Sequence, residues 1–109
     1  MTRLQQTIAR PASWGGVGLH TGKRVSLRFL PAGPDTGVVF RRVDLPGAPP
    51  IPATVDSVAD RPRQTALAAG AAEVQTVEHL LAALGGLGID NLSVETDGPE
   101  MPGGAGSAL

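Results

Sequence analysis

The sequence predicts a small α+β domain of two layers, in which a mostly antiparallel sheet packs against one helix at residues 76–85. Three observations predict this fold class. Short segments in which apolar and polar residues alternate are typical of half-buried strands. One segment has apolar residues at helical spacing instead. The length of 109 residues suits a single domain, which we place at residues 1–109.

The expected strands precede the helix, except for one that follows it. Residues 4–9 form a short opening strand, and a glycine-dense loop follows at 15–22. In residues 25–29 apolar and polar residues alternate, and a turn at 31–37 leads to a strand at 38–43, which predicts a hairpin. Further strands are expected at 54–58, 64–69 and 91–95, and a proline-rich loop at 46–52.

The predicted helix has two different sides. Thr76 is a favourable N-cap residue, and Gly85 with Gly86 predicts a left-handed end. One side carries an apolar stripe formed by Val77, Leu80, Leu81 and Leu84. The other side carries Glu78, His79, Ala82 and Ala83. Because alanine is small, we expect another layer of protein to pack closely over or near this side.

Glu78 and His79 are the candidate chemical groups of the helix. The positive end of the helix dipole favours a carboxylate and a neutral imidazole, and neutral imidazole is the form that binds metal. Adjacent helical positions do not share a face, so Glu78 suits a base acting on metal-bound water better than a second ligand. The second histidine of the helical metalloprotease pattern would stand at Ala83. This pattern leaves open whether the pair is a metal site or a solvated surface pair.

Composition excludes several classes of protein. Nine Lys+Arg balance ten Asp+Glu, and without a basic run the chain has no electrostatic footprint for nucleic acid. The longest uncharged apolar stretch, 80–89, is about half of what spans a bilayer. The N-terminus has no apolar signal region, and the lack of Cys excludes disulfides and thiolate metal sites. We therefore expect a cytoplasmic domain without a membrane span.

The glycine-dense loop superficially resembles a phosphate-binding loop. However, Val17 stands where such a loop has its first glycine, and Arg24 replaces the required Ser or Thr. Thr21 also stands where the dinucleotide pattern has its third glycine. We therefore interpret the glycines as shaping a tight turn between strands. His20 is then either a hydrogen-bonding residue of the loop or a site residue.

Five segments together resemble one family. Their order and spacing are similar to those of UDP-3-O-acyl-N-acetylglucosamine deacetylase, the zinc enzyme of the committed step of lipid A biosynthesis. The segments are Gly16 to Lys23, Phe40 to Leu45, Gln75 to Leu84, Gly88 to Asn91, and Glu100 to Pro102 with Gly106 to Ala108. The resemblance covers essentially the whole chain, but only the N-terminal part of a family whose members have two similarly folded α+β domains.

The resemblance implies roles for the helical pair. His79 corresponds to the first of three zinc ligands, and Glu78 to the general base that activates water. The water would attack the acetamide of UDP-3-O-acyl-N-acetylglucosamine and release acetate, with zinc polarising the carbonyl. The other ligands belong to a second domain that is absent from these residues, so we expect the chain to be inactive alone. His20 matches a family position near the site without a firm role.

Two departures from the family pattern keep an alternative open. Ala105 stands where the family usually has Asp, and Pro62 with Arg63 occurs in a segment expected to line the substrate. Ser107 is a helix N-cap signal with almost no helix after it, which favours a truncated N-terminal portion. The alternative is a non-catalytic remnant of the family that acts as an interaction module.

Overall fold

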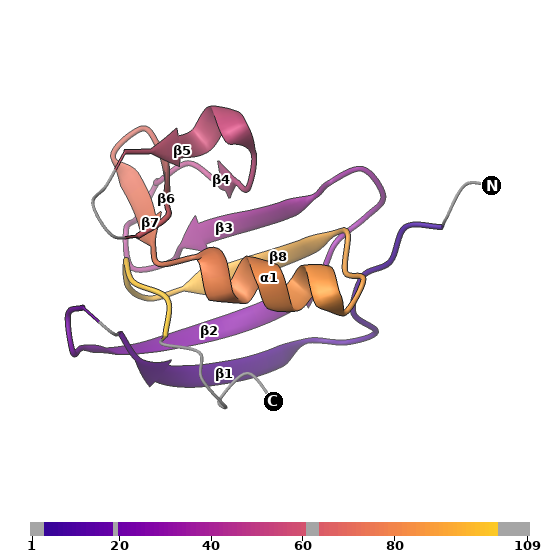
Figure 1. Ribbon diagram of the computed structural model, residues 1–109, viewed down its shortest axis with the longest axis horizontal. Helices are drawn as coiled ribbons and strands as arrows, with labels where there is room; N and C mark the ends of the chain where they lie inside the picture. Colours follow the sequence, from indigo (N-terminus) through magenta and orange to yellow (C-terminus); the bar gives the residue numbers. More distant parts are fainter. Residues whose placement is uncertain (1–3, 19, 61–63, 103–109) are drawn as a thin grey trace.

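The computed structural model describes residues 4–18, 20–60 and 64–102. Its larger sheet has five strands in the order β1-β2-β8-β3-β4, and a smaller sheet has three in the order β5-β6-β7 (Figure 1). The larger sheet contains β1 (Ala12–Val17), β2 (Arg24–Pro31), β8 (Leu92–Thr96), β3 (Val38–Arg42) and β4 (Ile51–Pro52). The smaller sheet contains β5 (Val58–Ala59), β6 (Ala66–Ala69) and β7 (Ala72–Gln75). The elements outside the sheets are a 3-10 turn, η1 (Val55–Ser57), and helix α1 (Glu78–Gly86).

The predicted fold class is confirmed. Helix α1 lies across one face of the larger sheet, which makes two layers (Figure 1). Three of the strand pairs in that sheet are antiparallel, and β3 with β8 is parallel. Among the described residues, no helix is long and apolar enough to cross a bilayer.

The expected hairpin between the second and third strands is wrong, because β8 lies between them. Val94 of β8 is opposite Phe29 of β2 on one side and opposite Phe40 of β3 on the other. Leu92 and Val94 are almost completely buried, so the central position places the most apolar side of β8 under the helix. The turn at 31–37 therefore connects two strands, β2 and β3, that lie on opposite sides of β8. The burial of β8, which is distant in the sequence, was therefore more favourable than pairing of the sequence neighbours β2 and β3.

Other strand boundaries also differ from the expectation. Residues 4–9 do not form a strand, because the backbone of Gln6 bonds to the loop at Asp90 and Asn91 instead. The proline-rich segment ends in the short edge strand β4, where the missing N–H of Pro52 is tolerated. The expected strand at 54–58 is mostly η1. Strand β7, which was not expected, pairs with β6 as a hairpin.

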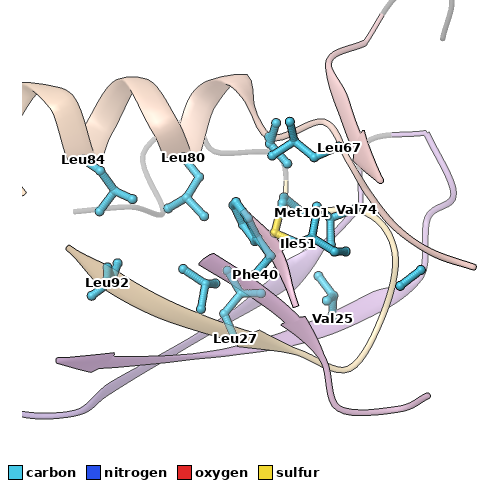
Figure 2. Close-up of a cluster of buried hydrophobic side chains, with 13 residues drawn as sticks. Val25, Leu27, Phe40, Ile51, Leu67, Val74, Leu80, Leu84, Leu92 and Met101 are labelled. Carbon is cyan, nitrogen blue, oxygen red and sulfur yellow. The ribbon is translucent and has the colours of Figure 1, made fainter. Parts of the chain in front are cut away.

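The core lies between α1 and the larger sheet. Leu80 and Leu84 point from the helix toward the sheet, above Phe40 and Leu92 (Figure 2). Leu67 and Val74 of the smaller sheet belong to the same buried cluster. The predicted apolar stripe is confirmed as the inner side of the helix, although Leu81 is only partly buried.

Both predicted ends of the helix are wrong. Thr76 is not the N-cap: it adopts a left-handed conformation with φ 59°, and the helix begins two residues later after Val77. Its hydroxyl donates to Gln64 Oε1 at 2.8 Å rather than capping the helix. Gly85 and Gly86 lie inside the helix, whose left-handed end is Gly88, with φ 73°.

The end at Gly88 has the two hydrogen bonds of a Schellman motif. The N–H of Gly88 donates to the carbonyl of Gly85 at 3.1 Å, and that of Ile89 to the carbonyl of Leu84 at 3.0 Å. The side chain of Ile89 also packs against the core. The motif therefore joins the end of the helix to the loop that leads into β8.

Gly88→Ala is expected to lower the free energy of unfolding by about 1–2 kcal/mol, because a Cβ is disfavoured at positive φ. Gly85→Ala is the matched control. Gly85 is helical and has open space for a Cβ, so alanine there is expected to raise stability by about 0.5–1 kcal/mol. Urea denaturation of the two variants measures both changes, and a shift of the same sign in both would contradict the assignment of Gly88 as the end of the helix.

Candidate active site

Glu78 and His79 occupy the first turn of α1. The helix orientation is set by Val77 and Leu80, which are buried in the core on either side of the pair. Glu78 is partly buried, and its Oε1 accepts a weak hydrogen bond from the N–H of Thr65 at 3.4 Å. His79 is exposed. The structure therefore places a carboxylate and an imidazole at consecutive positions of the first helical turn, between two buried residues.

The other members of this side of the helix are less covered than we expected. Ala82 is exposed, and no layer of the described residues covers it. Ala83 is partly buried and borders an apolar groove of about 360 Å³ along the C-terminal half of α1. The groove is lined mainly by Trp14, Phe29, Leu84, Ile89 and Leu92. Among the described residues, no carboxylate or imidazole lines this groove.

The residues present do not complete a metal site. Within 4–18, 20–60 and 64–102, there is no group of three His, Cys, Asp or Glu side chains that could hold a metal ion. A catalytic zinc ion needs about three protein ligands. His79 can supply one of them. The fit to zinc is thus partial, and the described chain alone falls short of a catalytic zinc centre.

Glu100 belongs to a segment that carries the family resemblance, but sequence reasoning gave the residue no role of its own. Its side chain is buried, with the residue only 2% exposed. Oε2 accepts the N–H of His20 at 2.7 Å, and Oε1 accepts the N–H of Thr21 at 2.8 Å. The hydroxyl of Thr76, whose one proton points mainly to Gln64 Oε1 at 2.8 Å, makes a weaker, shared contact with Oε2 at 3.3 Å. One feature of the sequence could have indicated its burial. Glu100 comes directly before Met101, and the side chain of Met101 is part of the core.

Hydrogen bonds keep Glu100 ionised despite its burial. Burial alone would raise the pKa of the Glu100 carboxyl. The N–H groups of His20 and Thr21, with the hydroxyls of Thr21 and Thr76, outweigh burial and hold the pKa below its ordinary value of 4.5. At neutral pH the group is therefore a buried carboxylate with several donors.

The loop predicted at 15–22 is a turn only in its second half, because Gly15, Gly16 and Val17 form the end of β1 and pair with β2. The N–H of Gly18 donates to the carbonyl of Lys23 at 2.9 Å, and that of Gly22 to the carbonyl of Gly18 at 3.0 Å. A Cβ at Gly18 would overlap Oε1 of Glu100, so the close approach of the carboxylate requires glycine there. Two N–H groups that a phosphate loop would offer to a ligand are bonded to Glu100 instead. His20 thus contributes its backbone N–H to this contact, although the residue as a whole is exposed.

The second resembling segment, Phe40 to Leu45, joins the two sheets. Arg42 forms a bidentate ion pair with Asp44, with N···O distances of 2.6 and 2.8 Å. Its Nη1 also donates to the backbone carbonyl of Glu73 in β7 at 2.9 Å. The hydrogen bonds from Arg42 lower the pKa of the Asp44 carboxyl. This arrangement stabilises the framework of the site rather than adding a reactive group.

Some residues of interest lie outside the described residues. These are Pro62, Arg63, Ala105 and Ser107. The predicted substrate-lining segment, the departure at the usual Asp position and the predicted helix start therefore stay predictions.

The structure defines an α+β domain with a carboxylate and an imidazole at a helix start, and comparison with known proteins gives the family. The family model described as UDP-3-O-acyl N-acetylglycosamine deacetylase (LpxC) matches residues 5–109. The chain belongs to this family.

Curated relatives of the same description extend well beyond the matched region. The chain is 50% identical to the UDP-3-O-acyl-N-acetylglucosamine deacetylase of Thermosynechococcus vestitus over 104 residues, which are 95% of the chain and 36% of that protein. It is 52% identical to the Anaeromyxobacter sp. protein over 95% of the chain and 34% of the relative. The Brucella melitensis biotype 2 protein is 46% identical over 94% of the chain and 36% of the relative. The chain thus spans about a third of the length of the relatives it matches.

Proposed function

We propose that residues 1–109 are the N-terminal domain of an enzyme that deacetylates UDP-3-O-acyl-N-acetylglucosamine, the committed step of lipid A biosynthesis. Family membership supports this activity. The observation that carries it is the Glu78–His79 pair, held at one helix start by the buried stripe of α1. The remaining two thirds of the relatives' length would supply the second domain. A cytoplasmic location stays a prediction.

Within the proposed reaction, His79 supplies one zinc ligand and the second domain supplies the others. Zinc, when bound, would polarise the acetamide carbonyl and stabilise the developing oxyanion. Exposure of His79 at the helix start suits this shared site, because a ligand from another domain needs access to the same ion. The described residues alone provide only this one imidazole next to Glu78.

Glu78 takes the proton of the attacking water. As that proton leaves, the water oxygen bonds to the acetamide carbonyl carbon. The C–N bond then breaks, the leaving nitrogen takes the proton from Glu78, and the products are acetic acid, which ionises to acetate, and a free amine on the sugar. A carboxylate at this position interacts favourably with the positive end of the helix dipole. The N–H of Thr65 makes a weak contact of 3.4 Å with Oε1.

The test compares the 109-residue chain with a completed enzyme, made by joining residues 1–109 to the part of the Anaeromyxobacter relative that follows its matched region. The completed enzyme is expected to bind about one zinc ion per chain and to release acetate from UDP-3-O-acyl-N-acetylglucosamine. The 109-residue chain is expected to do neither, because it lacks the other ligands. Calorimetry with zinc and an acetate assay measure the two properties, with circular dichroism to confirm folding.

Two outcomes would contradict the proposal. Stoichiometric zinc binding at micromolar or tighter affinity by the monomeric 109-residue chain would show that the site does not need a second domain. A folded, zinc-loaded completed enzyme that releases no acetate would refute the deacetylase activity, and would favour the non-catalytic interaction module instead.

A further inference from the structure

We propose that Glu100 is a positioning residue whose buried carboxylate joins the backbone of His20 and Thr21 to the segment that precedes α1. It thereby fixes the backbone at His20 relative to the Glu78–His79 pair. This inference rests on the proposed function, because the positioned groups are those of the deacetylase site. Glu100 itself touches none of the reacting groups among the described contacts.

A single carboxylate oxygen of Glu100 contacts both His20 and the segment that precedes α1. Oε2 of Glu100 accepts the N–H of His20 at 2.7 Å and makes the weaker contact with the hydroxyl of Thr76 at 3.3 Å. Thr76 lies two residues before Glu78 and three before His79. The loop and the helix start are therefore both within hydrogen-bond reach of one atom, although they are far apart in the sequence.

The backbone around Glu100 is held on both sides. The N–H of Gln75 donates to the carbonyl of Pro99 at 2.6 Å, and the N–H of Met101 donates to the carbonyl of Gln75 at 2.9 Å. Met101 is buried in the core, and Pro102 forms a bridge to Gly18. The carboxylate thus extends from a segment that is itself fixed to β7 and to the loop.

The segment before the helix carries backbone strain at the point of contact. Thr76 has φ 59°, a conformation that a β-branched residue rarely adopts. It is almost completely buried, and its hydroxyl donates mainly to Gln64 at 2.8 Å, with a weaker shared contact to Glu100 at 3.3 Å. Strain that is retained by surrounding contacts is typical of sites where geometry matters. Here those contacts set the direction in which the chain enters α1.

Glu100→Gln is the variant that tests this role. The amide of Gln has nearly the same shape as the carboxylate. However, one of the two oxygens becomes an NH₂ group, which cannot accept a hydrogen bond from the N–H of His20 or Thr21. We expect the amide protons of His20 and Thr21 to exchange about tenfold faster in the 109-residue chain. In the completed enzyme we expect kcat to fall by about tenfold or more, with a smaller change in KM, because misplaced groups weaken the transition state most.

Two further variants separate positioning from general stability. Glu100→Asp keeps the charge and is expected to restore part of kcat. Glu95→Gln is the matched control, because Glu95 lies on the outer face of β8 with only a 4.0 Å ion pair to Arg28. Its kcat, KM and amide exchange are expected to stay within about twofold of the wild type, as for most surface substitutions. All kinetics are normalised to the folded fraction.

The outcomes are distinct. Wild-type kcat in folded Glu100→Gln would overturn the positioning role, even if the melting temperature fell or the amides exchanged faster. If the wild-type completed enzyme releases no acetate, the proposed function fails, and amide exchange then tests the connection alone. Exchange that is unchanged by Glu100→Gln would overturn that connection, whereas faster exchange at His20 and Thr21 would support it.

Discussion

Replacing Glu78 by Ala in the completed enzyme is expected to lower kcat by about 10²–10⁴-fold, the usual contribution of a general base. The zinc content is expected to stay unchanged, because Glu78 acts on water and is not a ligand in the proposed site. Its side chain is only partly buried, so its removal leaves the core intact. Acetate release and metal analysis on the same preparation separate the two effects.

The result has two controls. Glu78→Gln keeps the shape of the side chain but replaces the carboxylate, which can accept a proton, by an amide. We expect this variant to lose as much turnover as Glu78→Ala. Glu95→Ala removes a carboxylate from the outer face of the sheet, and is expected to keep turnover within about twofold. Unchanged turnover in Glu78→Ala would refute the base role. Loss of zinc in proportion to turnover would instead make Glu78 part of the metal site.

The second large effect is expected in the core. Phe40→Ala should lower the free energy of unfolding of the 109-residue chain by about 3–5 kcal/mol, the usual cost of removing a buried aromatic side chain. Phe40 is 0% exposed and lies in β3 between β8 and β4, directly below Leu80 of the helix (Figure 2). A small domain has only about 5–15 kcal/mol of total stability, so a large part of the stability would be lost.

Urea denaturation followed by circular dichroism measures this loss. Val43→Ala is the control, because Val43 follows the same strand but is 57% exposed. We expect that variant to stay within about 0.5 kcal/mol of the wild type. A change below about 1 kcal/mol for Phe40→Ala would mean that β3 does not anchor the core as the structure indicates.

The sequence predicted those features whose cause is local. Alternation in residues 25–29 predicted β2 because successive side chains of a strand point to opposite faces. The stripe of Val77, Leu80 and Leu84 predicted the buried side of α1, because residues three and four apart share one face of a helix. The glycine loop was excluded as a phosphate site from its residue types alone, and the structure confirms a turn in its second half. Resemblance then identified the family that the comparisons show.

Features that depend on contacts between distant segments were predicted wrongly or missed. The turn at 31–37 indicated a hairpin, but β8 lies between β2 and β3, where its apolar side is buried under the helix. Thr76 has the composition of an N-cap, but its hydroxyl donates mainly to Gln64, with a weaker shared contact to Glu100. Gly85 and Gly86 suggested a helix end, yet the chain reaches the positive φ only at Gly88.

By itself, then, the sequence determined the fold class, the buried side of the helix and the candidate pair Glu78 and His79. Only the tertiary structure decided the strand order, the ends of the helix and the hydrogen-bond partners of Glu100. The physical reason is the range of the interactions. Periodicity and residue type act within a few positions, whereas Glu100 gains its donors from a loop some 80 residues earlier in the chain. Such a site exists only once the chain has folded.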